Sequence, residues 1–91
     1  MKKLSFRLRC FGVKKGKRKE TICNIEIERI DYVEINDELI EKYKLLAKET
    51  ANKNIKNPRD ISLIIREIEE TKDDFGVMES YIPFNDKTFP L

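Results

Sequence analysis

The chain of 91 residues is long enough for one hydrophobic core, and we expect a single domain over residues 1–91. Hydrophobic and charged residues each make up 40% of the chain, and no apolar stretch approaches the length of a membrane span, so no membrane partner is expected. Arg7 and Arg9 interrupt the apolar run that a signal peptide needs, and two cysteines are too few for a disulfide framework. We therefore expect a cytoplasmic protein.

Positive charge is concentrated at the start of the chain. Nine of the 19 lysine and arginine residues, and none of the 17 acidic residues, fall within residues 1–19, although the net charge is only +2. Such an asymmetry indicates an anionic partner.

The first predicted element is a β-hairpin. Apolar side chains alternate with polar ones at residues 4–10 and again at residues 23–28, which is the period of a strand with one buried face. The tract KKGKRK at residues 14–19 separates the two runs and contains Gly16, which suits a turn. Pairing in which the two residue numbers add up to 33 makes every pair chemically compatible. This register predicts the pairs Leu8–Ile25, Phe6–Ile27, Cys10–Cys23, Arg7–Glu26 and Phe11–Ile22.

A helix is predicted to follow the hairpin. Arg29 and Asp31 fall on the apolar phase of the second strand, which indicates a bulge or a bend near them. The helix should begin at Asn36 or Asp37, since both residue types are good N-caps. Its apolar spacing fades after Thr50, where a polar connector is expected.

A second helix is predicted over residues 57–68. Asn57 suits the N-cap and Pro58 the first helical position, and four isoleucines follow at helical spacing, namely Ile61, Ile64, Ile65 and Ile68. The high content of β-branched residues leaves a strand as the alternative. With a short strand over residues 77–82, the predicted order is ββααβ. This is an α+β fold in which a small antiparallel sheet, led by the N-terminal hairpin, carries two helices on one face.

Several kinds of chemistry lack their usual residues. The chain has no histidine, and neither GxxxxGK[ST] nor GxGxxG occurs among its three glycines, so we expect no enzyme activity, no cofactor and no metal site. Cys10 and Cys23 would face each other in the hairpin, which leaves a redox pair as the alternative to two buried thiols. The acidic residues between 67 and 74 are interpreted as a solvated surface and not as a magnesium site.

The basic hairpin is the strongest indication of function. Its tip carries Lys14, Lys15, Lys17, Arg18 and Lys19, and Arg7, Arg9 and Phe11 lie beside it. These cations suit phosphate groups, and Phe11 suits stacking on an exposed base. We therefore expect a non-catalytic module that binds nucleic acid, DNA or RNA, or a protein that already holds it. One alternative is that the lysine-rich tip serves only solubility. Another is that Arg7 is paired with Glu26 and is not available to a ligand.

The C-terminal segment supports a second hypothesis. Residues 81–91 are unusually apolar for a terminus, so we expect them to pack on the domain's own core or on a protein partner. The alternative function is a small protein-binding regulator or inhibitor, for example a phage or mobile-element protein that blocks a nucleic-acid-processing enzyme. Phe84 and Phe89 are its predicted contact residues. Homodimerisation through the open edge of the hairpin is a further alternative.

Overall fold

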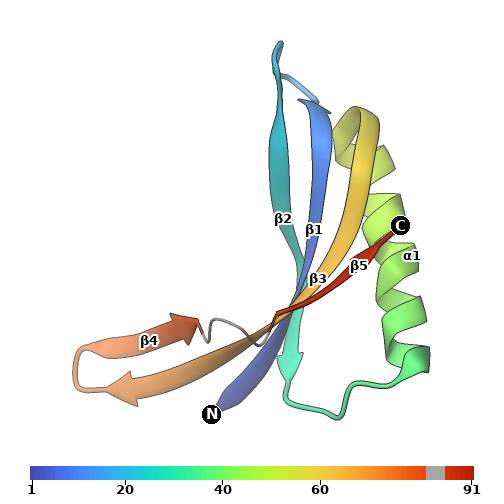
Figure 1. Cartoon of the computed structure of the whole chain (residues 1–91). Coiled ribbons are helices and arrows are strands. Elements are labelled where there is room, and N and C mark those ends of the chain that lie inside the picture. Colours follow the sequence, from blue (N-terminus) through green and yellow to red (C-terminus); the bar gives the residue numbers. More distant parts are fainter. Residues whose placement is uncertain (82–85) are drawn as a thin grey trace.

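The computed structural model describes residues 1–81 and 86–91. In chain order, its elements are β1 (Lys2–Lys14), β2 (Glu20–Asp31), α1 (Asp37–Asn54), β3 (Ile55–Asp73), β4 (Gly76–Tyr81) and β5 (Lys87–Pro90). The strands form one curled antiparallel sheet in the order β2-β1-β3-β4, with β5 paired to β3, and α1 covers one face of this sheet (Figure 1). The predicted α+β class is confirmed, but the described residues contain one helix and not two.

The β1–β2 hairpin has the predicted register towards its tip. The pairs that form as predicted are Arg7–Glu26, Leu8–Ile25, Cys10–Cys23 and Phe11–Ile22. Ile27 is an extra residue in β2, so that Phe6 lies opposite Glu28 and the predicted Phe6–Ile27 pair is wrong. This bulge reverses the side-chain alternation of β2 and turns Arg29 away from the helix. The irregularity that the sequence indicated near Arg29 therefore exists and lies just before it.

Helix α1 begins where the sequence predicts. Asn36 is the N-cap, and its side-chain oxygen accepts a hydrogen bond of 2.8 Å from the amide of Leu39. The helix continues past Thr50, the predicted end of its apolar pattern, because Ala51 is fully buried against the sheet and adds another turn of contact. The helix ends at Asn54, and the C-cap residue Ile55 donates a hydrogen bond from its amide to the carbonyl oxygen of Ala51 as the chain becomes extended.

The predicted second helix is wrong, because residues 57–68 belong to strand β3. Leu63 and Ile65 join the core under α1, whereas Ile64 and Ile68 are buried outside that cluster, on the opposite side of the strand. A strand that is buried on both faces has a nearly continuous apolar sequence, in which apolar residues also occur at helical spacing. Periodicity alone therefore does not distinguish a helix from a strand here. Pairing with almost the whole length of β1 favours the strand, in agreement with the β-branched residues.

The start of β3 contains two bulges where the sequence suggested a helix cap. Relative to β1, β3 has one extra residue between Lys56 and Arg59 and another between Arg59 and Ser62. Asn57 and Asp60 lie in these intervals, and their φ angles of 47° and 52° are in the left-handed region. The polar sequence around Asn57 therefore bends a strand and does not start a helix.

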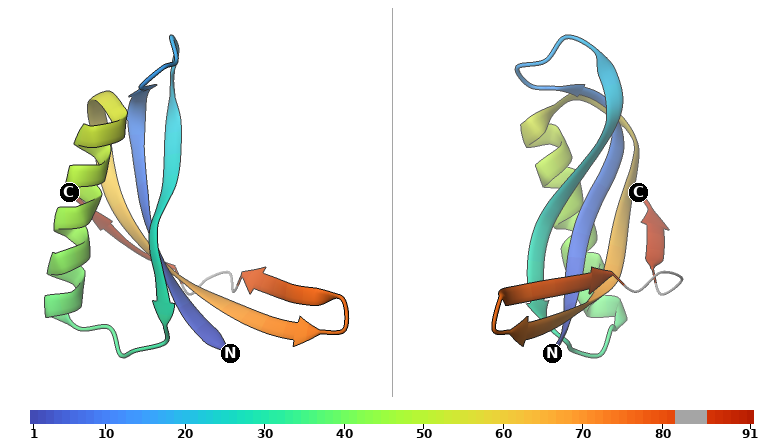
Figure 2. Two further views of the ribbon diagram at one scale, coloured as in Figure 1. Left: turned by 180° about the vertical axis from the view of Figure 1, so that it is seen from behind. Right: turned by 90° about the vertical axis from the view of Figure 1, so that its left-hand side faces the viewer.

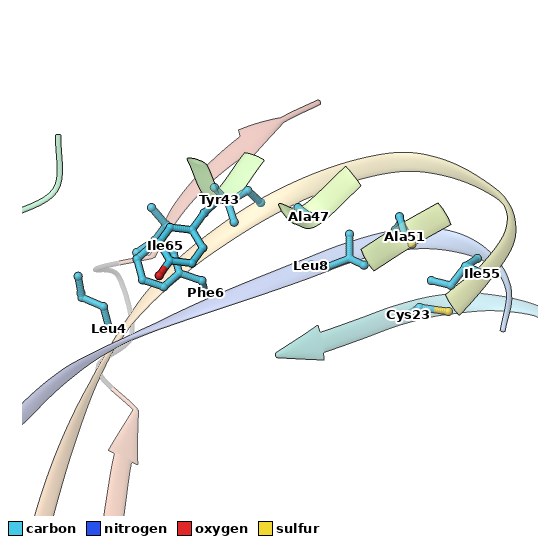
Figure 3. Packing of buried hydrophobic residues seen from close by; sticks show 11 residues of the cluster. Leu4, Phe6, Leu8, Cys23, Tyr43, Ala47, Ala51, Ile55 and Ile65 are labelled. Carbon is cyan, nitrogen blue, oxygen red and sulfur yellow. The ribbon is translucent and has the colours of Figure 1, made fainter. Parts of the chain in front are cut away.

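The core lies between α1 and the side of the sheet that faces it (Figure 3). The rings of Phe6 and Tyr43 are stacked, with centroids 3.6 Å apart and an interplanar angle of 12°. Ala47 and Ala51 are fully buried, and their small side chains let the helix approach the sheet. The other core residues are Leu4, Leu8, Cys10, Cys23, Ile55, Leu63 and Ile65. The opposite side of the sheet, to which Arg7, Arg9 and Phe11 of β1 point, is called the open face. The right-hand view of Figure 2 looks onto it, with α1 behind the sheet.

The end of β3 and β4 form a two-stranded arm that projects away from the helix and the rest of the sheet (Figures 1 and 2). We define the arm as residues 71–81. The strand predicted over residues 77–82 is confirmed up to Tyr81, and Ile82 lies outside the described residues. Strand β5 returns to β3 and places Phe89 and Leu91 against the core.

Candidate nucleic-acid interface

The hairpin tip projects from one end of the molecule, at the top of Figure 1. The chain turns at Gly16, which has a φ of 88°, and the amide of Lys17 donates a hydrogen bond of 2.9 Å to the carbonyl oxygen of Lys14. A shallow hollow of about 410 Å³ is lined by Lys14, Lys17, Arg18, Lys19 and Thr21. None of the ion pairs within residues 1–81 and 86–91 includes any of the five predicted tip cations. Their positive charge is therefore available to a ligand.

Two further lysines join the tip from the end of α1. The amide of Lys15 donates a hydrogen bond of 2.9 Å to the carbonyl oxygen of Asn54, and Lys56 lies opposite Val13 in the β1–β3 pairing. Lys53, in the last turn of α1, and Lys56 are both exposed. We define the basic end as Lys14, Lys15, Lys17, Arg18, Lys19, Lys53 and Lys56. No local signal in the sequence links residues 53 and 56 to the tip, because only the tertiary fold makes them neighbours.

The other three predicted contact residues lie on the open face and differ in their availability. Arg7 donates from Nη1 to Oε2 of Glu26 at 3.2 Å, so it is occupied as the alternative proposed. Phe11 is half-buried, and the guanidinium carbon of Arg59 lies 5.0 Å from the centroid of its ring. Arg9 is exposed and takes part in no ion pair among the described residues. Of these three side chains, Arg9 is therefore the free cation.

Arg29 organises a group of ion pairs on the open face, remote from the tip. Its Nε and Nη2 atoms donate to Glu26 at 3.1 and 2.9 Å, and its Nη1 atom donates to Glu70 at 3.5 Å and to Glu79. Ser5 donates a further hydrogen bond of 3.0 Å to Glu26. The hydrogen bonds from Arg29 hold the pKa of Glu26 below its ordinary value. These charged groups are paired with one another, so this part of the face has a structural role.

The first lysines of the chain lie at the far end of β1 from the tip. β1 contains 13 residues, which span roughly 40 Å at about 3.3 Å per residue. Lys3 donates from Nζ to Asp31 at 2.9 Å, and this hydrogen bond is the main reason why the pKa of Lys3 is raised. The amino group of Met1 is bonded to Glu69 at 3.1 Å. The positive charge of residues 1–19 is therefore divided between two ends of the molecule.

Of the two residues predicted for a protein contact, one lies among the described residues. Phe84 lies outside the described residues, and Phe89 is half-buried against the core, with the ammonium group of Lys44 5.7 Å from its ring centroid. The prominent exposed apolar side chains are instead on the arm, where Phe75 is 99% exposed and Val77 and Met78 are each 60% exposed. The sequence predicted a strand from Val77 onwards but did not show that the side chains of this region are exposed.

The cysteines and the acidic residues form no evident reactive centre. Cys10 and Cys23 are buried and carry free thiols. Burial, and then the neighbouring Cys23, raises the pKa of the Cys10 thiol and disfavours the reactive thiolate. Within residues 1–81 and 86–91, no group of three or more acidic or cysteine side chains is arranged to hold a metal ion.

No helix among the described residues has both the length and the apolar character needed to cross a membrane. No protein-family model matches the chain, and the comparisons with curated proteins and with solved structures found no similar protein. A functional conclusion therefore depends on the arrangement of the residues described above.

Proposed function

We propose that the protein is a non-catalytic module that binds the phosphate backbone of nucleic acid through its basic end. The observation that carries this proposal is the meeting of seven cations from β1, the hairpin loop and the α1–β3 junction, none of them in an ion pair among the described residues. Gathering like charges at one end of a small domain is unfavourable unless an anion neutralises them. A polyanion such as DNA or RNA supplies many phosphates at close spacing.

The shape of the basic end favours contact with phosphates over insertion into a groove. Strand β3 accompanies β1 as far as the Lys14–Ile55 pair, so that only residues 15–19 project freely. A free two-stranded ribbon, which fits a major groove, is therefore too short here. Contacts to phosphates fix the position of a protein without reading the bases. The acidic side chains of Asp31, Asp73 and Asp74, which lie away from the tip, would be kept away from the polyanion.

Titration of fluorescently labelled oligonucleotides tests this proposal. The probes are single-stranded and double-stranded DNA and RNA at low salt. The test variant changes Lys14, Lys15, Lys17, Arg18 and Lys19 to glutamine. The control variant has the same net charge and changes five exposed lysines elsewhere, namely Lys2, Lys42, Lys48, Lys72 and Lys87. We expect the parent and the control to bind and the test variant to lose binding, whereas failure of the parent to bind any probe would end the proposal.

The arm supports a second candidate function, binding to a protein. An isolated two-stranded hairpin has little stability of its own, and exposed apolar side chains such as those of Phe75 and Met78 are typical of an interface. Asp73 is the last residue of β3 and Asp74 lies in the turn that follows, so the tip of the arm is acidic. The complementary partner is a protein with an apolar groove rimmed by basic residues, as in the nucleic-acid channel of a processing enzyme. This candidate corresponds to the regulator or inhibitor that the sequence left open.

Inhibition assays with DNA- and RNA-processing enzymes test the second candidate. It predicts inhibition by the parent that is lost in Phe75→Ser, with no affinity of the parent for free nucleic acid. The control is Leu45→Ser, which removes an apolar side chain that is 60% exposed from α1, away from the arm. Equal inhibition by the parent and by Phe75→Ser would exclude the arm as the contact.

A further inference from the structure

A second hollow lies on the open face close to the basic end. It has a volume of about 350 Å³, and Arg9, Phe11, Ile22, Asp60, Ser62 and Thr88 are among its lining residues. These side chains come from four neighbouring strands, β2, β1, β3 and β5. Its volume is at the lower end of the range of about 300–1,000 Å³ for small-molecule sites. The hollow is therefore of a size for one small organic group.

Arg9 differs from the other arginines of the open face. Arg7 is paired with Glu26, Arg29 with the carboxylates around it, Arg59 with Glu20 at 2.8 Å, and Arg66 with Asp86 at 3.2 Å. Among the described residues, Arg9 alone of these five has no carboxylate partner, and it lines the hollow. Its guanidinium group is therefore available for an anion at the edge of this site.

The walls of the hollow suit a planar ring. Phe11 and Ile22 lie directly opposite each other in the β1–β2 pairing, and both line the site. Arg59 lies over Phe11 at 5.0 Å, which holds the aromatic ring in place. Ile22 lies on the edge strand β2 and is 52% exposed. An aromatic and an aliphatic side chain thus form an accessible apolar surface.

The opposite side of the hollow carries polar groups. Ser62 and Thr88 contribute hydroxyl groups, which both donate and accept hydrogen bonds. Asp60 contributes a carboxylate, and its backbone sits in the second bulge of β3 with a φ of 52°. The site therefore combines a cation, a ring platform, hydroxyl groups and an acceptor for amino or imino protons. This is the set of groups that recognises a nucleotide, in which a phosphate is joined to a flat base with polar edges.

We propose that this hollow binds one unpaired nucleotide of a single-stranded nucleic acid whose neighbouring phosphates lie on the basic end. The base stacks on Phe11 beside Ile22, its polar edge meets Asp60 and the hydroxyl groups, and Arg9 binds the adjoining phosphate. The inference rests on the proposed function and adds to it a preference for single strands, because a base within a duplex cannot reach a hollow on the surface of a sheet.

The test compares two variants of the hollow with the parent. Phe11→Leu and Arg9→Gln are titrated against a single-stranded oligonucleotide and against the same sequence as a duplex. The control is Tyr32→Leu, which removes a half-exposed aromatic ring outside the hollow. Both hollow variants should lose about tenfold in single-strand affinity, and Phe11→Leu, which removes no charge, should retain the duplex affinity of the parent. Phe11→Trp should restore the single-strand affinity, since it restores an aromatic surface.

A second measurement uses the unaltered protein, so that it does not depend on how the variants fold. A 2-aminopurine base within the single strand should lose fluorescence on binding, because stacking quenches it. Unchanged fluorescence together with equal affinity of parent and Phe11→Leu for the single strand would overturn the hollow while leaving the basic end intact. Absence of any binding by the parent would overturn the proposed function and the hollow together.

Discussion

The backbone amide of Lys15 in the hairpin loop donates a hydrogen bond of 2.9 Å to the carbonyl oxygen of Asn54 at the end of α1. This bond joins two segments that are far apart in the sequence. It also satisfies one of the carbonyl groups that the end of a helix leaves without a partner. As a result, Lys53 and Lys56 lie beside the hairpin tip, and the basic end is one surface.

The contact between Gly12 and the start of β3 should be essential to this arrangement. A Cβ atom added at Gly12 would lie 2.6 Å from Cγ2 of Ile55 and 3.0 Å from the carbonyl oxygen of Lys56. We predict that Gly12→Ala lowers the free energy of unfolding by about 1–3 kcal/mol, as measured by urea denaturation. In a double-mutant cycle, Ile55→Ala removes the obstructing methyl group. The decreases in the free energy of unfolding of the two single variants should therefore add up to more than the decrease of the double variant. Strict additivity would contradict the contact.

The five tip cations should contribute to binding and not to the stability of the fold. They are exposed, and the ion pairs of the described residues do not include them. Because like charges repel within a Debye length of about 10 Å at 0.1 M salt, changing all five to glutamine should leave the melting temperature equal to that of the parent or raise it. Thermal unfolding followed by circular dichroism measures this. A lower melting temperature of the variant would indicate that these side chains hold the fold together.

The buried hydroxyl group of Tyr43 should make stability depend on alkaline pH. It donates a hydrogen bond of 2.8 Å to Oε2 of Glu28, and burial together with this bond raises the pKa of Tyr43 to about 12. In the unfolded chain a tyrosine ionises near pH 10. The stabilisation is therefore complete below about pH 10 and is lost as the pH rises towards 12, because the unfolded state then loses its proton first.

Comparison of the parent with Tyr43→Phe isolates this effect from the lysines that titrate in the same range. At neutral pH the variant should be less stable by about 1 kcal/mol through loss of the hydrogen bond. The difference in the free energy of unfolding should shrink between pH 10 and 12. Parallel pH profiles for the two proteins would rule out the raised pKa.

The parts of the fold that could be predicted depend on neighbours in the sequence. The alternation in β1 and β2 determines the register around Leu8 and Ile25, and the side chain of Asn36 caps α1. The structure of residues 57–68 depends instead on the free edge of β1, a partner more than 40 residues away, which local spacing does not reveal. The same reason applies to Lys53 and Lys56, because their place at the basic end follows from tertiary contacts.

The candidate site was predictable to a similar extent. The tip cations and Arg9 are exposed and outside the ion pairs of the described residues, whereas Arg7 is bound to Glu26, and the binding of nucleic acid by these cations stays a prediction. The hollow beside Phe11 could not be predicted, since Asp60 reaches it only through a bulge in a segment whose pattern favoured a helix. Of the arm, only the strand from Val77 to Tyr81 was predicted, whereas its pairing with the end of β3 was not.

The central claim is that the hairpin tip and the α1–β3 junction form one phosphate-binding surface. The most direct test is the salt dependence of affinity for a single-stranded oligonucleotide, measured for the parent and for Lys53→Gln/Lys56→Gln. Each lost phosphate contact should lower the slope of log K against log salt by about 0.7, so the double variant should show a reduction of about 0.7–1.4 with weaker binding to every sequence. A slope and affinity identical to those of the parent would contradict the claim, because the junction would then lie outside the interface.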